Sequence, residues 1–384
     1  MNVLHVFKTA FPFTQGGLEE SIRQICLNSG VAADGIDVAC IAPKGARASV
    51  TDAGYARLLA YPAEIRLSTC PVALRMLGPL WQAFDRYDVV HLHAPWPFAE
   101  LAALLRPGGR ARRVVTYHAD IVNRDMLAAA YRPFITRVLN GCDAVVATSE
   151  PYIDSSPVLS RLKRRPMVVP LGIDPASYPE PEPDRIAAWR DRLGDGFFLF
   201  LGVLRYYKGL DILAEASRHV AAPTVIVGDG PERPRIEALA AGRDDLICTG
   251  HLPDADKVAL LHLARAVVLP STKRGEAFGI SLLEGAMASR PLVSTALGTG
   301  TDIVNRHGET GLVVPPADPA ALADAMRRLE SEPANAAALG RAARRRFETQ
   351  YTGETMGAAY ADLYKGLLAS TTSMRSTVAK TTSG

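Results

Sequence analysis

Two sets of short apolar runs, separated by a proline-rich segment, constrain the fold of this chain most strongly. Most of the runs are apolar throughout rather than alternating, which is typical of parallel strands buried on both faces of a sheet. The expected strands of the first set are Val3–Phe7, Asp37–Ala42, Val89–His93, Val114–Tyr117, Ala144–Thr148 and Met167–Pro170. Those of the second set are Phe197–Val203, Thr224–Gly228, Leu246–Thr249, Ala266–Pro270, Pro291–Ser294 and Gly311–Val314.

Amphipathic patterns between these runs predict helices, among them Gly17–Asn28, Asp254–Arg265 and Ile280–Ala288. Alternation of strand and helix implies doubly wound parallel sheets. The segment Ile173–Pro183 has four prolines in eleven residues and is predicted to be a linker, since it cannot continue a sheet or a helix. The expected architecture is therefore α/β, with two Rossmann-like domains over residues 1–172 and 184–345 that face a cleft.

The last helical pattern spans roughly Asn335–Leu368 and is long enough to cross back to the first domain. We expect the part from about residue 346 to 368 to pack on that domain. Residues 370–384 are small and polar, and the sequence predicts a disordered tail there.

The composition excludes several classes of protein. The 384 residues include 43 Lys and Arg against 40 Asp and Glu, a net charge of +3, which argues against a nucleic-acid partner. The five cysteines are odd in number and form no CxxC pair, so neither a disulfide framework nor a zinc site is indicated. No secretion leader and no apolar run of about 18 residues is recognised, and the expected location is the cytoplasm.

Two loops are candidates for binding an anion. Gly16 and Gly17 follow the first strand and open the first helix, where free backbone amides and the helix dipole favour a negative ligand. Arg205 and Lys208 lie in the loop after the first strand of the second domain, and together they suit a diphosphate. The alternatives are a plain strand–helix turn and a surface pair of cations.

Two carboxylates eight residues apart, Glu276 and Glu284, frame the start of a predicted helix. The backbone amides of Phe278, Gly279 and Ile280 lie between them, and carboxylates at this place can accept hydrogen bonds from sugar hydroxyls. The alternative is a helix cap and a solvated glutamate.

One histidine, His118, follows a strand at its carboxyl end and is a candidate site residue. By contrast, His5, His91 and His93 lie inside strands, and we interpret them as packing residues. The pair Asp254 and Asp256 has the spacing of a DxD metal motif, but it starts a helix, where Asp commonly serves as a cap, so no metal site is predicted.

Taken together, these segments resemble the family-4 retaining glycosyltransferases with the GT-B fold, over nearly the whole chain. The most specific element is the EX7E motif, here Glu276 to Glu284 in EAFGISLLE. The GGLEE loop, the LRYYKG segment and the VGDGP segment stand in the family's order. The sequence is most similar to bacterial polysaccharide-assembly members, many of them mannosyltransferases.

The resemblance implies a role for each candidate residue. Glu284 would bind the donor's ribose. Arg205 and Lys208 would bind its diphosphate, helped by amides at Gly16 and Gly17. Glu276 and the amides of Phe278 and Gly279 would contact the donor sugar, and His118 would contact it near the reacting carbon. The Gly250–Pro253 loop, including Leu252, would lie near the base. Gly230 and Ile280 are further implied donor-binding residues.

The implied activity is metal-independent transfer of a hexose from a nucleotide-diphosphate sugar, without a cofactor and with retention. The expected donor is GDP-mannose or a related GDP-deoxyhexose, with UDP sugars left open. The expected acceptor is a saccharide or lipid-linked saccharide of a bacterial surface polysaccharide, such as lipopolysaccharide, bound by the first domain. Two alternatives remain: a sugar-nucleotide epimerase, and a non-catalytic nucleotide-sugar-binding relative.

The segment Leu67–Phe84 is apolar with scattered cations and includes Arg75, Trp81 and Phe84. It either packs on the first domain as a helix or touches a membrane or a lipid-linked acceptor. Basic clusters at 106–113 and 161–165 are either solvated loops or surfaces attracted to anionic lipid at the inner face of the cell membrane.

Overall fold

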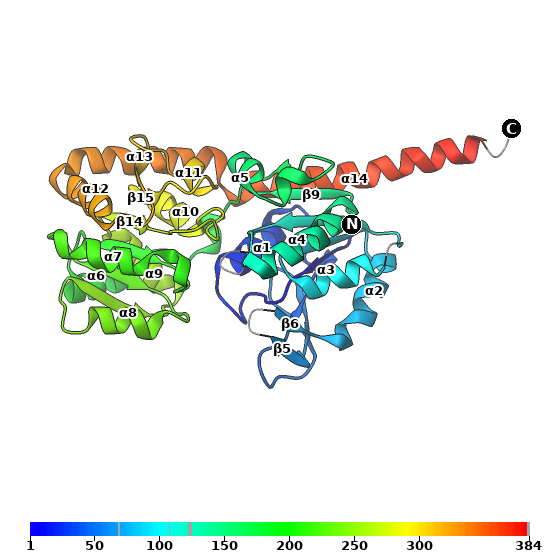
Figure 1. Ribbon diagram of the computed structural model, residues 1–384, viewed down its shortest axis with the longest axis horizontal. Coiled ribbons are helices and arrows are strands. Elements are labelled where there is room, and N and C mark those ends of the chain that lie inside the picture. Colours follow the sequence, from blue (N-terminus) through cyan, green and yellow to red (C-terminus); the bar gives the residue numbers. More distant parts are fainter. Residues whose placement is uncertain (68–69, 107, 122–124, 382–384) are drawn as a thin grey trace. The chain divides into compact units, whose positions relative to one another are not determined.

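The computed structural model describes residues 1–67, 70–106, 108–121 and 125–381 of the chain. It divides into two compact units (Figure 1). Unit 1 comprises Met1–Val169 and the segment from Gly353 onward, and unit 2 comprises Pro170–Thr352. Each unit contains its own sheet with helices packed on it.

The sheet of unit 1 has, within the described residues, eight strands in the order β10-β9-β8-β7-β1-β2-β4-β3. All neighbours are parallel except β3 and β4. The central strands β1 and β7 are buried at every position, as expected for strands covered on both faces. The strands are β1 (Val3–Val6), β2 (Ile36–Ile41), β3 (Ser49–Asp52), β4 (Arg57–Tyr61), β7 (Val89–Ala94), β8 (Arg112–Tyr117), β9 (Ala144–Ala147) and β10 (Met167–Val168).

A separate antiparallel hairpin joins β5 (Ile65–Leu67) to β6 (Cys70–Val72) in the same unit. The α-helices of unit 1 are α1 (Gly17–Asn28), α2 (Leu77–Arg86), α3 (Pro97–Leu104), α4 (Asp125–Asn140), α5 (Glu150–Ser155) and α14 (Gly353–Thr381). Its short 3₁₀ turns are Ala33–Gly35, Leu74–Met76 and Leu159–Arg161.

Unit 2 contains a six-stranded, fully parallel sheet in the order β13-β12-β11-β14-β15-β16. Its strands are β11 (Phe198–Leu201), β12 (Thr224–Val227), β13 (Leu246–Gly250), β14 (Ala266–Leu269), β15 (Leu292–Thr295) and β16 (Gly311–Val314). Its α-helices are α6 (Pro183–Leu193), α7 (Leu210–Ala216), α8 (Arg233–Ala240), α9 (Asp254–Leu263), α10 (Ile280–Met287), α11 (Thr301–Val304), α12 (Pro319–Ser331) and α13 (Pro333–Gln350). Its 3₁₀ turns are Pro175–Ser177, Tyr206–Lys208 and Ser217–His219.

All twelve predicted strand runs form strands, and the helix predicted over Gly17–Asn28 has those bounds. The single helix expected over roughly 335–368 is instead two helices, α13 and α14. The break falls at Tyr351 and Thr352, because Tyr351 turns out of the helix and its carbonyl accepts the Ile173 amide at 3.0 Å. The helix that returns to unit 1 therefore starts at Gly353 rather than near residue 346.

Two further expectations differ from the structure. The segment 173–183 lies within unit 2 and contains a 3₁₀ turn, capped by Asp174, whose carboxylate accepts the Ala176 amide at 2.9 Å. The tail predicted as disordered over 370–384 continues α14 to Thr381, since no Pro or Gly interrupts residues 367–381; residues 382–384 lie outside the described part.

Helix α14 packs against α1 in unit 1, and glycine permits the close approach. A Cβ at Gly357 would overlap the carbonyl oxygen of Asn28, so the two backbones meet there. Further along, Tyr360 and Tyr364 are fully buried and reach the sheet. The helix therefore covers one face of the sheet at β7 and β8, where Tyr364 forms a hydrogen bond with His91 and Tyr360 forms one with Thr116. No helix in the described ranges combines the length and apolarity needed to cross a membrane.

Candidate functional site

The loops after β11 and β12 in unit 2 meet through glycine backbones in close contact. Gly202, Gly228 and Gly230 all have positive φ. A Cβ at Gly228 would overlap the carbonyl oxygen of Gly202, and one at Gly230 would lie 2.5 Å from that of Leu204. The Leu204 amide donates to Asp229 at 2.9 Å. These contacts fix the loop that presents Arg205 and Lys208 at the carboxyl end of the sheet.

The two cations of this loop differ in environment. Arg205 is exposed, and no hydrogen-bond or ion-pair partner for its guanidinium is found within the described residues. Lys208 is largely buried, with 12% of its side chain exposed, and forms an ion pair with Glu276. Burial lowers the pKa of Lys208, but the Glu276 carboxylate outweighs this and raises it above its ordinary value, so the amine stays charged.

Glu276 is fixed from several sides. Its carboxylate also accepts a hydrogen bond from the Ser271 hydroxyl at 3.0 Å, and its carbonyl accepts one from Thr299 at 2.9 Å. The loop after β14 thus positions the carboxylate against the loop after β11. Two residues that the sequence separates by 68 positions form one buried, charged pair.

Helix α10 begins four residues after Glu276. Gly279 has φ of 86° and precedes the helix, and a Cβ there would come within 2.8 Å of Leu269. The side chain of Phe278 is buried edge-on against Tyr351, with ring centroids 5.9 Å apart, so any ligand contact of Phe278 is by its backbone. Ile280 is half-buried and starts the helix. The first amides of α10 have no partner inside the helix.

Glu284 lies one turn into α10 and is 9% exposed. Tyr178 donates a hydrogen bond to its Oε1 at 3.2 Å. Sequence reasoning missed Tyr178, because the residue belongs to the proline-rich segment that was interpreted only as a linker. The structure places a tyrosine from that segment on the second carboxylate of the EX7E motif.

The loop after β13 carries Leu252, which is half-buried and follows Gly250, a residue with φ of 74°. Asp256 accepts hydrogen bonds from Arg185 and from the Trp189 indole, both at 2.9 Å, and so ties α6 to α9. Asp254 forms an ion pair with Lys257. Both carboxylates of the DxD pattern therefore have partners within unit 2.

Gly16 and Gly17 lie at the start of α1 in unit 1. Gly16 is the N-cap, with no side chain to satisfy the first amides, and Gly17 is exposed. The predicted anion loop is therefore an open helix N-terminus.

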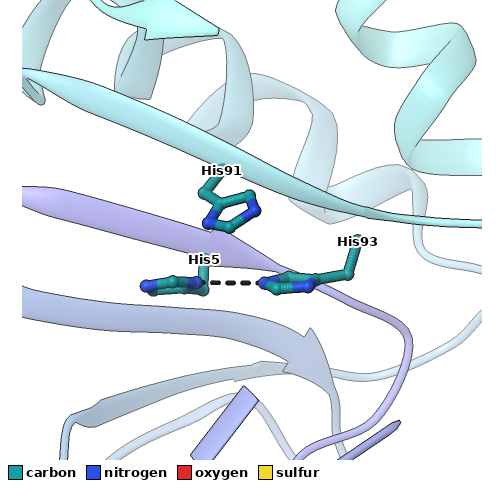
Figure 2. Close-up of side chains that lie close together, drawn as sticks. All are labelled: His5, His91 and His93. Atoms are coloured by element: carbon teal, nitrogen blue, oxygen red, sulfur yellow. Dashed lines mark hydrogen bonds between the residues drawn. The ribbon is translucent and has the colours of Figure 1, made fainter. Parts of the chain in front are cut away.

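The candidate histidine of unit 1, His118, lies just beyond β8, is 5% exposed, and is part of a larger cluster. Its Nε2 lies 2.9 Å from Nδ1 of His93, whose Nε2 in turn lies 3.0 Å from Nδ1 of His5 (Figure 2). His91 bonds instead to Tyr364 at 2.7 Å and Thr116 at 2.8 Å. The three strand histidines are buried as predicted, but they also form hydrogen bonds, which the packing interpretation missed.

Burial keeps these imidazoles neutral. It lowers the pKa of His5 and of His118 to about 3. The pKa values of His91 and His93 lie well below the ordinary range, through burial first and the neighbouring imidazoles second.

The segment Leu67–Phe84 was expected either to pack on the first domain as a helix or to touch a membrane. Its C-terminal part belongs to α2 and packs on unit 1. Residues 68–69 lie outside the described ranges. Met76, Leu80 and Phe84 are buried against unit 1, whereas Trp81 remains 36% exposed. Trp81, Gln82, Asp85, Leu105 and Arg106 line one cavity, called here the Trp81 patch.

Comparison with known proteins identifies the class. The model for glycosyltransferase family 4 matches residues 15–177, and that for glycosyl transferases group 1 matches residues 183–346. The chain is therefore a glycosyltransferase. It is 42% identical over 360 residues to the D-rhamnosyltransferase WbpZ of Pseudomonas aeruginosa, which covers 92% of each chain. It is 40% identical over 376 residues to the O-antigen chain mannosyltransferase C of Escherichia coli, covering 96% of this chain and 100% of that one.

The chain belongs to glycosyltransferase family 4. Among solved structures, the sucrose-phosphate synthase of Thermosynechococcus elongatus matches with a TM-score of 0.80 and 21% identity, over 96% of this chain and 100% of that one. This likeness confirms the fold, which is GT-B, with two Rossmann-like domains.

Proposed function

We propose that the enzyme transfers a hexose of manno configuration from a nucleotide-diphosphate sugar to a growing surface polysaccharide. The observation that carries the proposal is the buried Lys208–Glu276 pair beside the exposed Arg205, in a chain of this family. Relatives named for mannose and D-rhamnose transfer support the sugar, since these hexoses differ only at C6. The relative named for the O-antigen chain supports the polysaccharide acceptor.

In this proposal, the two cations stabilise the diphosphate as it leaves. Breaking the sugar–phosphate bond places negative charge on the diphosphate, and preorganised cations stabilise that charge without a metal. Glu276 contacts the sugar with the amides of Phe278 and Gly279, and Glu284 contacts the ribose. His118 is proposed to contact the transferred sugar. Transfer with retention is proposed from the family resemblance.

Nucleotide binding tests the donor assignment. We expect GDP to raise the melting midpoint of the purified protein more than UDP, ADP or dTDP, because the proposed donor is a GDP sugar. A bound ligand at about 100 times its Kd adds roughly 2.7 kcal/mol to the free energy of unfolding. The proposed donor, GDP-mannose or a GDP-deoxyhexose, should then yield product with a saccharide acceptor in the presence of EDTA.

A shift with UDP alone would replace the donor and keep the class of enzyme. A changed nucleotide sugar without any acceptor would indicate an epimerase. A shift without any reaction would indicate a non-catalytic binding protein.

We further propose that the Trp81 patch contacts a membrane that holds a lipid-linked acceptor. Support comes from the exposed side chains of Trp81 and Leu105, the latter 61% exposed, beside Arg106, which forms an ion pair with Asp85 at 2.7 Å. An exposed indole with a neighbouring apolar side chain suits the interface of a bilayer.

Vesicle co-sedimentation tests this surface. The double variant Trp81→Ala/Leu105→Ser is expected to reduce binding to vesicles containing anionic phospholipid by about tenfold. Met126→Ser is the matched control, since Met126 is an exposed apolar residue outside the patch. Equal binding by the double variant and the wild type would rule out the patch as the contact.

A further inference from the structure

Four histidines from three neighbouring strands form a continuous buried cluster in unit 1. His5 comes from β1, His91 and His93 from β7, and His118 follows β8. Hydrogen bonds link His5 to His93 and His93 to His118, with nitrogen–nitrogen distances of 3.0 and 2.9 Å. His5, His93 and His118 thus form a hydrogen-bonded chain, called here the chain of three, with His5 at its inner end.

A metal site is the first alternative, since His5, His91 and His93 offer nitrogens within 4.8 Å of one another. The rings do not fit it. An imidazole ligand directs its lone pair in the plane of the ring, but His91 and His93 are stacked, with centroids 4.4 Å apart and an angle of 27°. In the view of Figure 2 the His91 ring lies above the rings of His5 and His93, which are seen nearly edge-on. Both nitrogens of His91 are also engaged, by Tyr364 and Thr116.

Proton counting restricts the chain of three. A neutral imidazole carries one N–H. If His5 donates from Nδ1, then His93 must donate from Nδ1 to Nε2 of His118, and the His118 proton lies on Nδ1. In the reverse arrangement His118 donates from Nε2, and the His5 proton lies on Nε2. Moving only the two bridging protons would leave His5 without a proton and His118 with two. Interconversion of the two neutral arrangements therefore also requires a proton gained at Nε2 of His5 and one lost from Nδ1 of His118.

The inner end of the chain favours the first arrangement. Nε2 of His5 is buried and has no hydrogen-bond partner within the described residues. In the first arrangement this atom is a bare lone pair, and in the second it is an orphaned N–H. Orphaned buried N–H groups are rarer in proteins than under-satisfied acceptors.

We propose that His5 and His93 are positioning residues that hold His118 as the neutral tautomer with its proton on Nδ1. His118 then presents Nδ1–H as an uncharged hydrogen-bond donor, while its Nε2 is committed to His93. The ligand group it suits is an oxygen acceptor, a sugar hydroxyl or phosphate oxygen. The catalytic consequence rests on the proposed function; the tautomer does not.

Two measurements test the proposal independently. In the intact, ¹⁵N-histidine-labelled protein, NMR of the imidazole nitrogens should show His118 protonated at Nδ1 and unprotonated at Nε2 at pH 7. A spectrum with the proton on Nε2, or with a charged ring, would overturn the proposal even if no transfer activity were found.

Kinetics supply the second measurement. His93→Phe removes the donor to Nε2 and is expected to lower kcat about 100-fold, with little change in donor KM. His93→Asn retains a donor amide near the position of Nδ1 and should recover much of kcat. His91→Phe is the control, since His91 is equally buried but lies outside the chain of three; it should lower the melting midpoint comparably and keep kcat within about threefold.

Equal kcat for His93→Phe and His91→Phe would assign His93 a structural role only. If the wild-type protein bound none of the nucleotides, that result would count against the proposed function. It would not affect the assignment of the His118 tautomer by NMR.

Discussion

Replacing Lys208 by methionine is expected to lower the transfer rate by roughly 100- to 1000-fold and also to destabilise unit 2. The rate falls because the leaving diphosphate loses a preorganised cation. Stability falls because Glu276, with 10% of its side chain exposed, is left as an uncompensated buried charge, at a typical cost of about 3–5 kcal/mol. Initial rates at saturating donor and the melting midpoint measure the two effects.

Two companion variants separate these effects. Arg205→Ala should lower the transfer rate to a similar degree with little change in melting midpoint, since Arg205 is exposed and has no partner in the described part of the chain. Lys208→Met/Glu276→Gln should recover most of the lost stability, because no charge remains buried, and stay inactive. Near-normal turnover by either single variant would refute its leaving-group role.

The parallel strands were predictable because their sequence signal is strong. A strand buried on both faces, such as Phe198–Leu201, is apolar at every position. The same pattern cannot reveal an edge strand like Ser49–Asp52, which is exposed throughout. The strand Arg57–Tyr61 does have a buried face, with Leu58 and Ala60 in the core, and it was missed together with the three-residue strands β5 and β6. Hydrophobic periodicity reports burial, and it is uninformative where a strand has no buried face.

The site was predictable in its residues but not in its contacts. The family motif indicates Lys208 and Glu276 separately, whereas their ion pair follows from two loops that adjacent strands β11 and β14 bring together. Tyr178 was missed for the same reason, since its contact with Glu284 spans 106 positions. The histidine chain depends on strand order: β1 pairs with β7, and β7 with β8, so that residues far apart in sequence become neighbours.

The histidine cluster also predicts strong acid sensitivity: the free energy of unfolding should fall by several kcal/mol between pH 7 and pH 5. In the unfolded chain each histidine has a pKa near 6.5, whereas burial lowers the pKa of His5 and His118 to about 3. Below pH 6.5 the unfolded chain therefore binds more protons, and stability falls as the pH falls towards 3. Each neutral buried histidine accounts for about 2 kcal/mol of the loss at pH 5.

One carboxyl in unit 1 opposes this trend. Burial raises the pKa of Glu100 to about 7, although Tyr131 and the Trp96 amide donate hydrogen bonds to it. A raised carboxyl pKa has the reverse sign, since the folded state then binds the extra proton and gains stability as the pH falls from 7 towards 4.5. The gain at pH 5 is about as large as the loss from one histidine. Four buried histidines lose stability as the pH falls and one carboxyl gains it, so the net effect of lowering the pH is destabilisation.

Denaturant unfolding at pH 7 and pH 5 measures the difference, and two variants should shift it in opposite directions. Glu100→Gln cannot take up the proton, so its stability should fall more steeply than that of the wild type. His5→Asn removes one buried imidazole, so its stability should fall less steeply, by about 2 kcal/mol. His251→Gln, at an exposed histidine, is the control and should keep the wild-type dependence. If His5→Asn lost stability in parallel with the wild type, His5 would have to take up its proton in the folded protein as it does in the unfolded chain, and burial would not hold this imidazole neutral at pH 5.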